Sequence, residues 1–326
     1  MYYYAFASGN SSLFTDRRYA EKLKEIGLIR KNNPLFCKMI VCRNIDKAKI
    51  AARFFPFKKI VVYQPELFVD TVKTKAVKVN WFNRVIVING FNEGVFFNNF
   101  HFLSSYIYND ENDLGLKKNE LLSTSSLFTE EQFKRARHTI FVGMKRKATE
   151  IEPKNSAMGI DLNTKRQEIA QATIDKGIGV VVGKGWGKQA KYEGSGFDAG
   201  NTNWWDTKLE LLKSYRFNIA LENTLWKYYV TEKIWHAIKA GCLPIYWGKG
   251  SSIYDTFPKN SFIDASEFET SEALVDYIAD LSYDSWFKRM EKCIETYNAS
   301  IQKMTYSKLD EALNRIQERI FGSLVY

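Results

Sequence analysis

Residues 217–268, FNIALENTLWKYYVTEKIWHAIKAGCLPIYWGKGSSIYDTFPKNSFIDASEF, decide the fold that this sequence predicts. Short apolar runs at 217–221 and 243–246 are typical of buried parallel strands, and the run at 231–239 between them predicts a helix. This strand, helix, strand order indicates a doubly wound α/β sheet. Glu222, Asn223 and Thr224 directly follow the first strand, so we expect them at the carboxyl edge of the sheet, where such folds bind ligands.

The start of that helix has the features of an anion site. Thr231 stands at the capping position, and Glu232 and Lys233 follow in the first turn. Free backbone N–H groups and the positive end of the helix dipole attract anions, and a nearby ammonium adds to this attraction. These residues therefore predict a diphosphate site. A plain helix cap beside a salt bridge fits the same spacing, so spacing alone leaves both interpretations open.

Strand and helix patterns also alternate outside this segment. Further strands are predicted at 38–42, 59–63, 84–88, 139–143 and 178–182, and further helices at 45–54, 164–175 and 206–215. A chain of 326 residues exceeds one ordinary domain. We predict an N-terminal lobe at 1–135, a second lobe at 136–300 and a C-terminal helical segment at 301–326, with a cleft between the two lobes.

The last part of the chain predicts a long amphipathic helix. Apolar residues recur at steps of three and four from Met290 to Met304 and again from Leu309 to Ile320, with a break expected near Ser307. Packing against the lobes is favoured over contact with a membrane surface, because acidic residues interrupt the basic face. This pattern leaves the oligomeric state open.

The composition narrows the class of protein. Apolar residues make up 45% of the chain and aromatic residues 15%, which favours a globular protein over a disordered one. The net charge of +10 favours an anionic partner, but the basic residues are spread along the chain, so charge alone does not select one. No signal region and no apolar stretch of about 18 residues occurs. We expect a cytoplasmic protein, with peripheral contact to the inner membrane face as the alternative.

Patterns typical of metal and nucleophilic catalysis are missing from the sequence. The three histidines are isolated and no DxD pair accompanies them, so no catalytic metal is expected. No GxSxG turn or Cys/His nucleophile occurs, and the four cysteines lack zinc spacing, which predicts buried, reduced thiols. The glycine-rich run 183–187 lacks P-loop spacing. We therefore interpret it as a loop near the cleft in preference to a phosphate-binding loop. Arg166, which opens a predicted helix, suits either a phosphate clamp or a surface position.

The order of motifs from Arg216 to Phe268 resembles the family 10 glycosyltransferases, the α-1,3/4-fucosyltransferases, in their bacterial form. The shared pattern is a strand, Glu-Asn-Thr, a six-residue step from Asn223 to Tyr229, Val-Thr-Glu-Lys, Ala-Gly, Pro-Ile-Tyr-Trp-Gly and Pro-Lys-x-Ser-Phe-Ile. Upstream, Phe141-Val142, Arg166 and the run VYQPE at 62–66 resemble the family's strand, its phosphate-binding arginine and its Tyr-x-Gly-Glu turn. Pro65 stands where the family often has glycine.

This resemblance implies a fold and a reaction. The family fold is GT-B, with two Rossmann-like lobes facing a cleft, and its members invert the anomeric centre without a metal or other cofactor. The resemblance implies transfer of L-fucose from GDP-fucose to a hydroxyl of an N-acetylglucosamine or glucose unit in an oligosaccharide. An α-1,3 linkage is favoured over α-1,4.

The resemblance also implies roles for particular residues. Glu66 would be the general base, and Arg166 and Lys233 would neutralise the departing diphosphate. Glu232 would accept hydrogen bonds from the ribose hydroxyls, and Glu222 would lie near the donor sugar. The donor-binding set that we expect comprises Arg166, Glu222, Asn223, Tyr229, Thr231, Glu232 and Lys233.

Two other functions fit part of this pattern. A GT-B enzyme that uses another nucleotide sugar would have similar diphosphate-binding residues. A non-catalytic protein that binds glycans or nucleic acid would use the basic residues differently, on one continuous face. The charged residues instead gather at strand and helix ends of one motif, so no nucleic-acid partner is expected.

Overall fold

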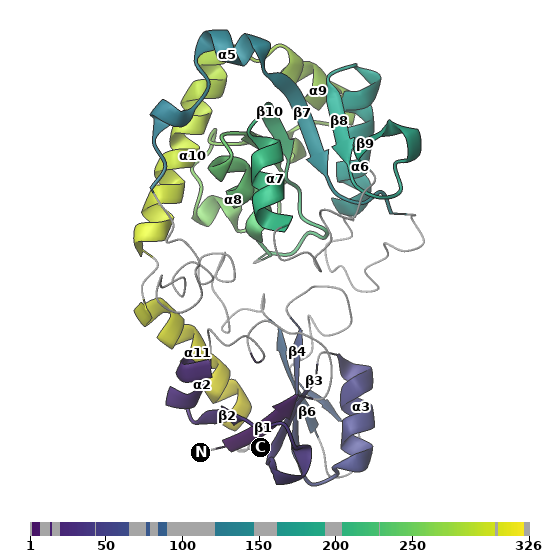
Figure 1. The fold of residues 1–326 in the computed structure, drawn as a ribbon, viewed down its shortest axis with the longest axis vertical. Coiled ribbons are helices and arrows are strands. Elements are labelled where there is room, and N and C mark those ends of the chain that lie inside the picture. Colours follow the sequence, from purple (N-terminus) through teal and green to yellow (C-terminus); the bar gives the residue numbers. More distant parts are fainter. Residues whose placement is uncertain are drawn as a thin grey trace. The chain divides into compact units, whose positions relative to one another are not determined.

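The chain folds into two compact units (Figure 1). The computed structural model describes residues 2–6, 14, 20–42, 44–64, 76–78, 84–89, 121–146, 162–192, 204–227, 229–303 and 306–322. Met1–Lys117 and Met304–Tyr326 form the first unit, and Lys118–Lys303 form the second. Each unit is built around a sheet that is wholly or mostly parallel, which confirms the predicted α/β class.

The first unit has a six-stranded sheet in the order β2-β1-β3-β4-β6-β5. Its strands are β1 (Tyr2–Phe6), β2 (Leu28–Arg30), β3 (Met39–Cys42), β4 (Lys59–Gln64), β5 (Ala76–Lys78) and β6 (Arg84–Asn89). Only the pairing of β5 with β6 is antiparallel among these strands. Every residue of β3 is apolar because the strand is buried on both faces. Helix α3 (Ile45–Phe54) packs on one face, and α2 (Ala20–Glu25) packs on the other.

The end of the chain completes the core of the first unit. Helix α10 (Tyr283–Lys303) ends in the second unit, and α11 (Tyr306–Phe321) buries Leu313, Ile316 and Ile320 against β3 and β4 in the first. Gln317 also donates a hydrogen bond to the Ile26 carbonyl at 3.0 Å. The predicted segment 301–326 is therefore split between the two units, because an amphipathic pattern shows which helix face is buried but not what it packs against.

The first boundary between the two units also differs from the prediction at residue 135. It falls at Lys117, because residues 121–135 pack on α10 of the second unit. The ring of Phe133, in α5 (Glu130–Arg135), lies 5.2 Å from that of Trp286 on α10. Leu122 and Asn298 exchange two hydrogen bonds, at 2.8 and 2.9 Å. These contacts assign α5 to the second unit.

The second unit has an entirely parallel sheet in the order β12-β11-β10-β7-β8-β9. Its strands are β7 (Arg137–Val142), β8 (Gly179–Val182), β9 (Ala190–Tyr192), β10 (Tyr215–Ile219), β11 (Leu243–Tyr246) and β12 (Ile263–Asp264). The helices that follow its strands are α6 (Leu162–Asp175), α7 (Trp204–Leu212), α8 (Glu232–Lys239) and α9 (Ser271–Ala279). From β7 the chain continues to β8 on one side, and from β10 it continues to β11 on the other. The boundary between β7 and β10 is therefore the switch point at which α/β folds form a crevice.

All four cysteines are buried and none forms a disulfide, as expected. Among the helices of the described ranges, none combines the length and the hydrophobicity that crossing a bilayer requires.

Candidate functional site

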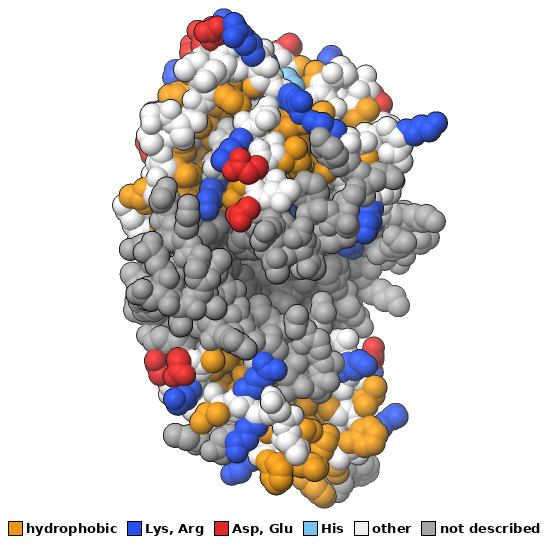
Figure 2. Space-filling model, viewed as in Figure 1, with side chains coloured by type: hydrophobic (Ala, Val, Ile, Leu, Met, Phe, Trp, Pro, Cys, Tyr) orange, Lys and Arg blue, Asp and Glu red, His pale blue; other side chains and the backbone are white. Residues whose placement is uncertain are grey.

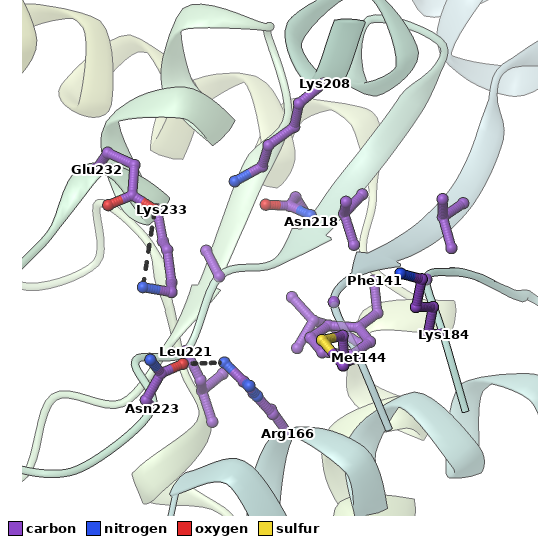
Figure 3. A pocket seen from close by; sticks show the side chains of 16 residues that line it. Phe141, Met144, Arg166, Lys184, Lys208, Asn218, Leu221, Asn223, Glu232 and Lys233 are labelled. Atoms are coloured by element: carbon purple, nitrogen blue, oxygen red, sulfur yellow. Dashed lines mark hydrogen bonds and ion pairs between the residues drawn. The ribbon is translucent and has the colours of Figure 1, made fainter. Parts of the chain in front are cut away.

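A pocket of about 260 Å³ lies at the carboxyl ends of β7, β8 and β10 (Figure 3). It is therefore located at the switch point of the second sheet. Residues after all three strands line it together with side chains from α6, α7 and α8, namely Phe141, Val142, Gly143, Met144, Arg166, Val182, Gly183, Lys184, Lys208, Asn218, Ile219, Ala220, Leu221, Asn223, Glu232 and Lys233. Four of these side chains are cationic and one is anionic, so the pocket is suited to an anionic ligand.

The glycine-rich run after β8 forms one side of the pocket by close backbone packing. Gly183 has φ +137°, and a Cβ atom there would lie 2.5 Å from the Gly143 carbonyl oxygen. Only glycine fits this position. Trp186 turns back from the same run and donates from Nε1 to the Gly143 oxygen at 2.9 Å. The run thus joins the turns after β7 and β8 and brings Lys184 to the pocket.

A buried carboxylate organises the start of α8. Glu222 accepts hydrogen bonds from the Thr231 backbone N–H at 2.7 Å and from the Tyr246 hydroxyl at 3.1 Å. Its second oxygen accepts from the Thr231 hydroxyl at 2.8 Å and from Lys233 Nζ at 2.9 Å. Glu222 therefore connects the end of β10 to α8 through four donors. This arrangement fixes the Lys233 ammonium at the pocket wall.

Thr231 occupies the predicted N-cap position of α8 with an extended backbone, but its side chain makes no capping hydrogen bond. The hydroxyl bonds Glu222 instead, because that buried carboxylate requires donors. The N–H groups of the first helical turn are therefore not used by the cap side chain.

Glu232 is an ionised acceptor on the pocket wall. Burial acts to raise its pKa, but the charges of Lys233 and Lys208 outweigh burial and lower the pKa to about 2. Its carboxylate lies 3.8 Å from Lys233 Nζ. At neutral pH this side chain can only accept hydrogen bonds, which suits it to ligand hydroxyls.

Arg166 and Asn223 form a hydrogen-bonded pair that also lines the pocket. Arg166, on α6, is only 6% exposed, so the alternative of a surface arginine is excluded. Its Nη1 donates to Asn223 Oδ1 at 2.6 Å, and Asn163 Nδ2 donates to the Asn223 carbonyl at 2.7 Å. The guanidinium carbon also lies 5.6 Å from the centre of the Phe141 ring. These contacts orient the arginine along the pocket (Figure 3).

Sequence reasoning missed Lys208, the most deeply buried amine of the site. This α7 side chain is 7% exposed, and its Nζ points into the pocket (Figure 3). Among the residues that the structure describes, none forms a hydrogen bond or salt bridge with it. Burial lowers the pKa of the amine to about 8, although Glu232 acts in the opposite direction. The available signal was positional, since Lys208 precedes the buried Leu212 by one helical turn and takes a place expected to be apolar.

The structure thus gathers Arg166, Asn223, Glu232 and Lys233 on one pocket, with Glu222 and Thr231 behind them. Tyr229 is buried before α8 and is not among the pocket-lining residues. Glu66 lies outside the described residues. Within the described ranges, no group of three or more His, Cys, Asp or Glu side chains could hold a metal ion.

A parallel α/β unit with clustered cations at its switch point is typical of α/β proteins that bind phosphate-bearing ligands at the carboxyl edge of the sheet. Residues 162–319 match the family model described as "Glycosyltransferase family 10 (fucosyltransferase) C-term". The chain is therefore similar to the C-terminal part of family 10 glycosyltransferases over slightly less than half of its length, in the region where its motifs predicted the resemblance.

Curated relatives share short, clearly similar segments with this chain. An α-(1,4)-fucosyltransferase of Arabidopsis thaliana is 38% identical over 81 residues, which are 25% of this chain and 20% of that protein. The α-(1,3)-fucosyltransferase FucT of Helicobacter pylori is 44% identical over 71 residues, which are 22% of this chain and 15% of that protein. The chain thus matches only 15–20% of the length of these relatives.

Among solved structures, an α1,3-fucosyltransferase with GDP-fucose has a TM-score of 0.46 and 15% identity, covering 93% of this chain and 91% of that chain. The β-glucosyltransferase of T4 phage has a TM-score of 0.49 and 11% identity, covering 98% of this chain and 99% of that chain.

Proposed function

We propose that this protein transfers L-fucose from GDP-fucose to a hydroxyl of an N-acetylglucosamine or glucose unit in an oligosaccharide, with inversion and with α-1,3 favoured over α-1,4. The observation that carries the proposal is the cluster of Arg166, Lys184, Lys208 and Lys233 on one pocket of a unit that is similar to family 10 glycosyltransferases. A cytoplasmic site of action is part of the proposal, and cell fractionation tests it.

The charges of the pocket support binding of a diphosphate. Four cations face two carboxylates, Glu232 and the Glu222 that bonds Lys233, which leaves two positive charges in excess. A nucleoside diphosphate brings negative charge that this excess offsets. As the bond from the sugar to the diphosphate breaks, charge develops on the leaving oxygen, and fixed cations stabilise it. Side chains would supply this stabilisation with no metal or other cofactor.

Polar groups around the cations would orient the rest of the donor. Glu232, ionised at neutral pH, would accept from the ribose hydroxyls. Arg166 is oriented by Asn223 and would place its guanidinium fork on two phosphate oxygens. Glu222 would act through Lys233, whose position it fixes, rather than through the ligand.

The acceptor hydroxyl needs a base as it attacks the anomeric carbon, and we assign this role to Glu66. It follows β4, which ends at Gln64, by two residues. In this step the Glu66 carboxylate takes the hydroxyl proton, the new glycosidic bond forms, and the bond to GDP breaks. The proton ends on Glu66 and the charge ends on GDP.

The direct test is acceptor-dependent release of GDP from GDP-fucose, followed by linkage analysis of the product by NMR. N-acetyllactosamine and lactose serve as acceptors, and GDP-mannose, UDP-galactose and UDP-glucose serve as alternative donors. We expect turnover with GDP-fucose alone and an α-1,3 product. Turnover with another donor instead would overturn the donor assignment.

Glu66→Gln tests the base. We expect transfer to be lost while GDP binding, measured by calorimetry, stays near that of the unchanged chain, because the substitution removes only the proton acceptor. Glu21→Gln, an exposed position in the same unit, is the matched control. Loss of GDP binding would show that Glu66 serves the donor and not the acceptor.

A further inference from the structure

The first unit exposes a concentration of large hydrophobic side chains. Five of the eight large hydrophobic residues that are exposed in the described ranges lie between positions 35 and 57. Their exposed fractions are 68% for Leu35, 72% for Phe36, 47% for Ile50, 75% for Phe54 and 86% for Phe57. Single exposed apolar residues are ordinary, but a contiguous group marks an interaction surface.

Helix α3 carries large apolar side chains on its outer face, where packing of the core does not require them. The helix buries Ala48, Ala51 and Ala52 against the sheet. Of its three larger apolar side chains, Ile45 packs against the core, whereas Ile50 and Phe54 lie one turn apart on the opposite, exposed face. A helix that served only the core would place its large side chains inward and its small or polar ones outward. The outer face of α3 is therefore specified for contact with something else.

The exposed side chains form one surface because Lys58 joins the two segments that carry them. One segment is the short helix η2 (Pro34–Phe36), and the other is the end of α3 with the turn at 55–58. Lys58 Nζ donates to the carbonyls of Pro34 at 2.5 Å and Leu35 at 2.8 Å. We name these two segments the apolar edge. Figure 2 shows hydrophobic side chains gathered with Lys and Arg side chains on this part of the unit.

Basic residues surround the apolar edge. The described residues from 31 to 58 include one acidic residue, Asp46, and six basic ones, Lys31, Lys38, Lys47, Lys49, Arg53 and Lys58. This is an excess of five positive charges beside exposed phenyl rings. Such a combination fits a surface that is anionic at its face and apolar just beneath.

The apolar edge lies where the strands begin. It directly precedes β3, which starts at Met39, and β4, which starts at Lys59. Ligand sites of α/β sheets lie at the opposite, carboxyl edge. A partner bound at the apolar edge would therefore leave the carboxyl edge of this sheet accessible.

We propose that the apolar edge binds the anionic surface of a lipid bilayer, with Phe36, Phe54 and Phe57 inserted at the headgroup level. Two copies of this chain would bring like charges together at this edge, whereas an anionic bilayer neutralises them. The inference is independent of the sugar-transfer reaction, since it concerns only the first unit.

Vesicle sedimentation of the full chain tests the proposal, with phosphatidylcholine vesicles that contain or lack phosphatidylglycerol. We expect binding only to the anionic vesicles, and weaker binding at high salt. Phe54→Ser/Phe57→Ser should weaken binding on the order of tenfold or more, because the inserted rings are lost. Lys47→Ala/Arg53→Ala should weaken it too, whereas Lys188→Ala/Lys213→Ala in the second unit should not.

A matched apolar control is Leu121→Ser, since Leu121 is also exposed but lies in the second unit. Equal binding to neutral vesicles, or vesicle binding that survives Phe54→Ser/Phe57→Ser, overturns the proposal. So does a concentration-dependent dimer in light scattering that this double variant disperses, because the edge would then be an interface between copies. All substituted side chains are exposed, and circular dichroism of each variant confirms that it folds.

Discussion

Two helices of the second unit bring an ammonium group to the same pocket, and the protein holds the two groups in opposite ways. At the start of α8, Lys233 hydrogen-bonds Glu222 and Thr231, both at 2.9 Å. On α7, Lys208 is buried without a hydrogen bond or salt bridge to any other described residue. The first cation is positioned by the protein itself. The second bears a burial cost that the charge of Glu232 offsets only in part, and an anionic ligand would relieve more of it.

The two lysines therefore suit two different tasks, which are stabilising charge during a reaction and binding an anionic ligand. A fixed cation is already in place before the ligand arrives, so its contribution to a reacting group is large. A cation with a lowered pKa makes binding depend on pH and weakens the fold that carries it. Substitutions at Lys233, Lys208 and Thr231 test this division.

Lys233→Ala should have the largest effect. We expect the rate of fucose transfer to fall on the order of 10²-fold, because a preorganised charge at the leaving group is lost. Steady-state kinetics with GDP-fucose measures this. Lys213→Ala, an exposed lysine of the same unit, should change nothing. Near-normal turnover of Lys233→Ala would remove the distinction between the two cations.

Lys208→Met should change how GDP binding responds to pH. In the unchanged chain, binding should weaken as pH rises through about 8, because Lys208 loses its charge there. The variant should bind GDP on the order of tenfold more weakly at neutral pH and lack this pH step. Calorimetric titrations at several pH values measure both. A pH step that persists in Lys208→Met would assign it to another group.

The same variant should stabilise the fold near neutral pH. Burial lowers the Lys208 pKa from 10.5 to about 8, so the unfolded chain binds more protons than the folded one between these values. Raising the pH through this window should therefore stabilise the unchanged chain, by about 3 kcal/mol at most. Lys208→Met should gain stability below pH 8 and lose this dependence. Chemical unfolding of both chains checks the sign, and a less stable variant would contradict it.

Thr231→Val should have a smaller effect. It removes the hydroxyl that donates to Glu222 and accepts from Lys233, and should cost about 1 kcal/mol of unfolding free energy. Thr231→Ser keeps the hydroxyl and should restore most of this stability in thermal unfolding. If valine and serine behave alike, the hydroxyl does not contribute to holding Lys233.

The contrast between Lys233 at a helix start and Lys208 in mid-helix also explains how much of the site the sequence could predict. The residues around Lys233 were found because they occupy the end of an apolar strand and the start of a helix, positions with a known relation to ligands. Arg166, which lines the pocket, was assigned to the phosphate site only through the resemblance, because its local sequence also suited a surface position. Lys208 lies in mid-helix, where its position one turn before Leu212 is the local sign of burial, and a solvated lysine fits that position as well. Its role depends on which face of α7 the pocket contacts.

The fold shows the same limit at a larger scale. The strand at 243–246 and the helix at 231–239 were predicted within a residue, because their apolar runs have clear ends. The sequence did not predict that α5 belongs to the second unit and α11 to the first. Phe133 and Ile316 indicate that one face of each helix is buried. The element against which that face packs is distant in sequence, so local patterns do not identify it. Glu66, outside the described residues, stays a prediction from resemblance.

The place of α11 has a consequence for how the protein is made. The second unit is one continuous stretch, Lys118–Lys303, whereas the first unit needs Leu313 and Ile320 from the end of the chain to fill its core. Domains usually fold in the order in which the ribosome releases them. Here the first unit cannot complete its core until α11 has been synthesised, which happens only after the whole second unit has been made. We therefore expect the second unit to reach its final packing before the first.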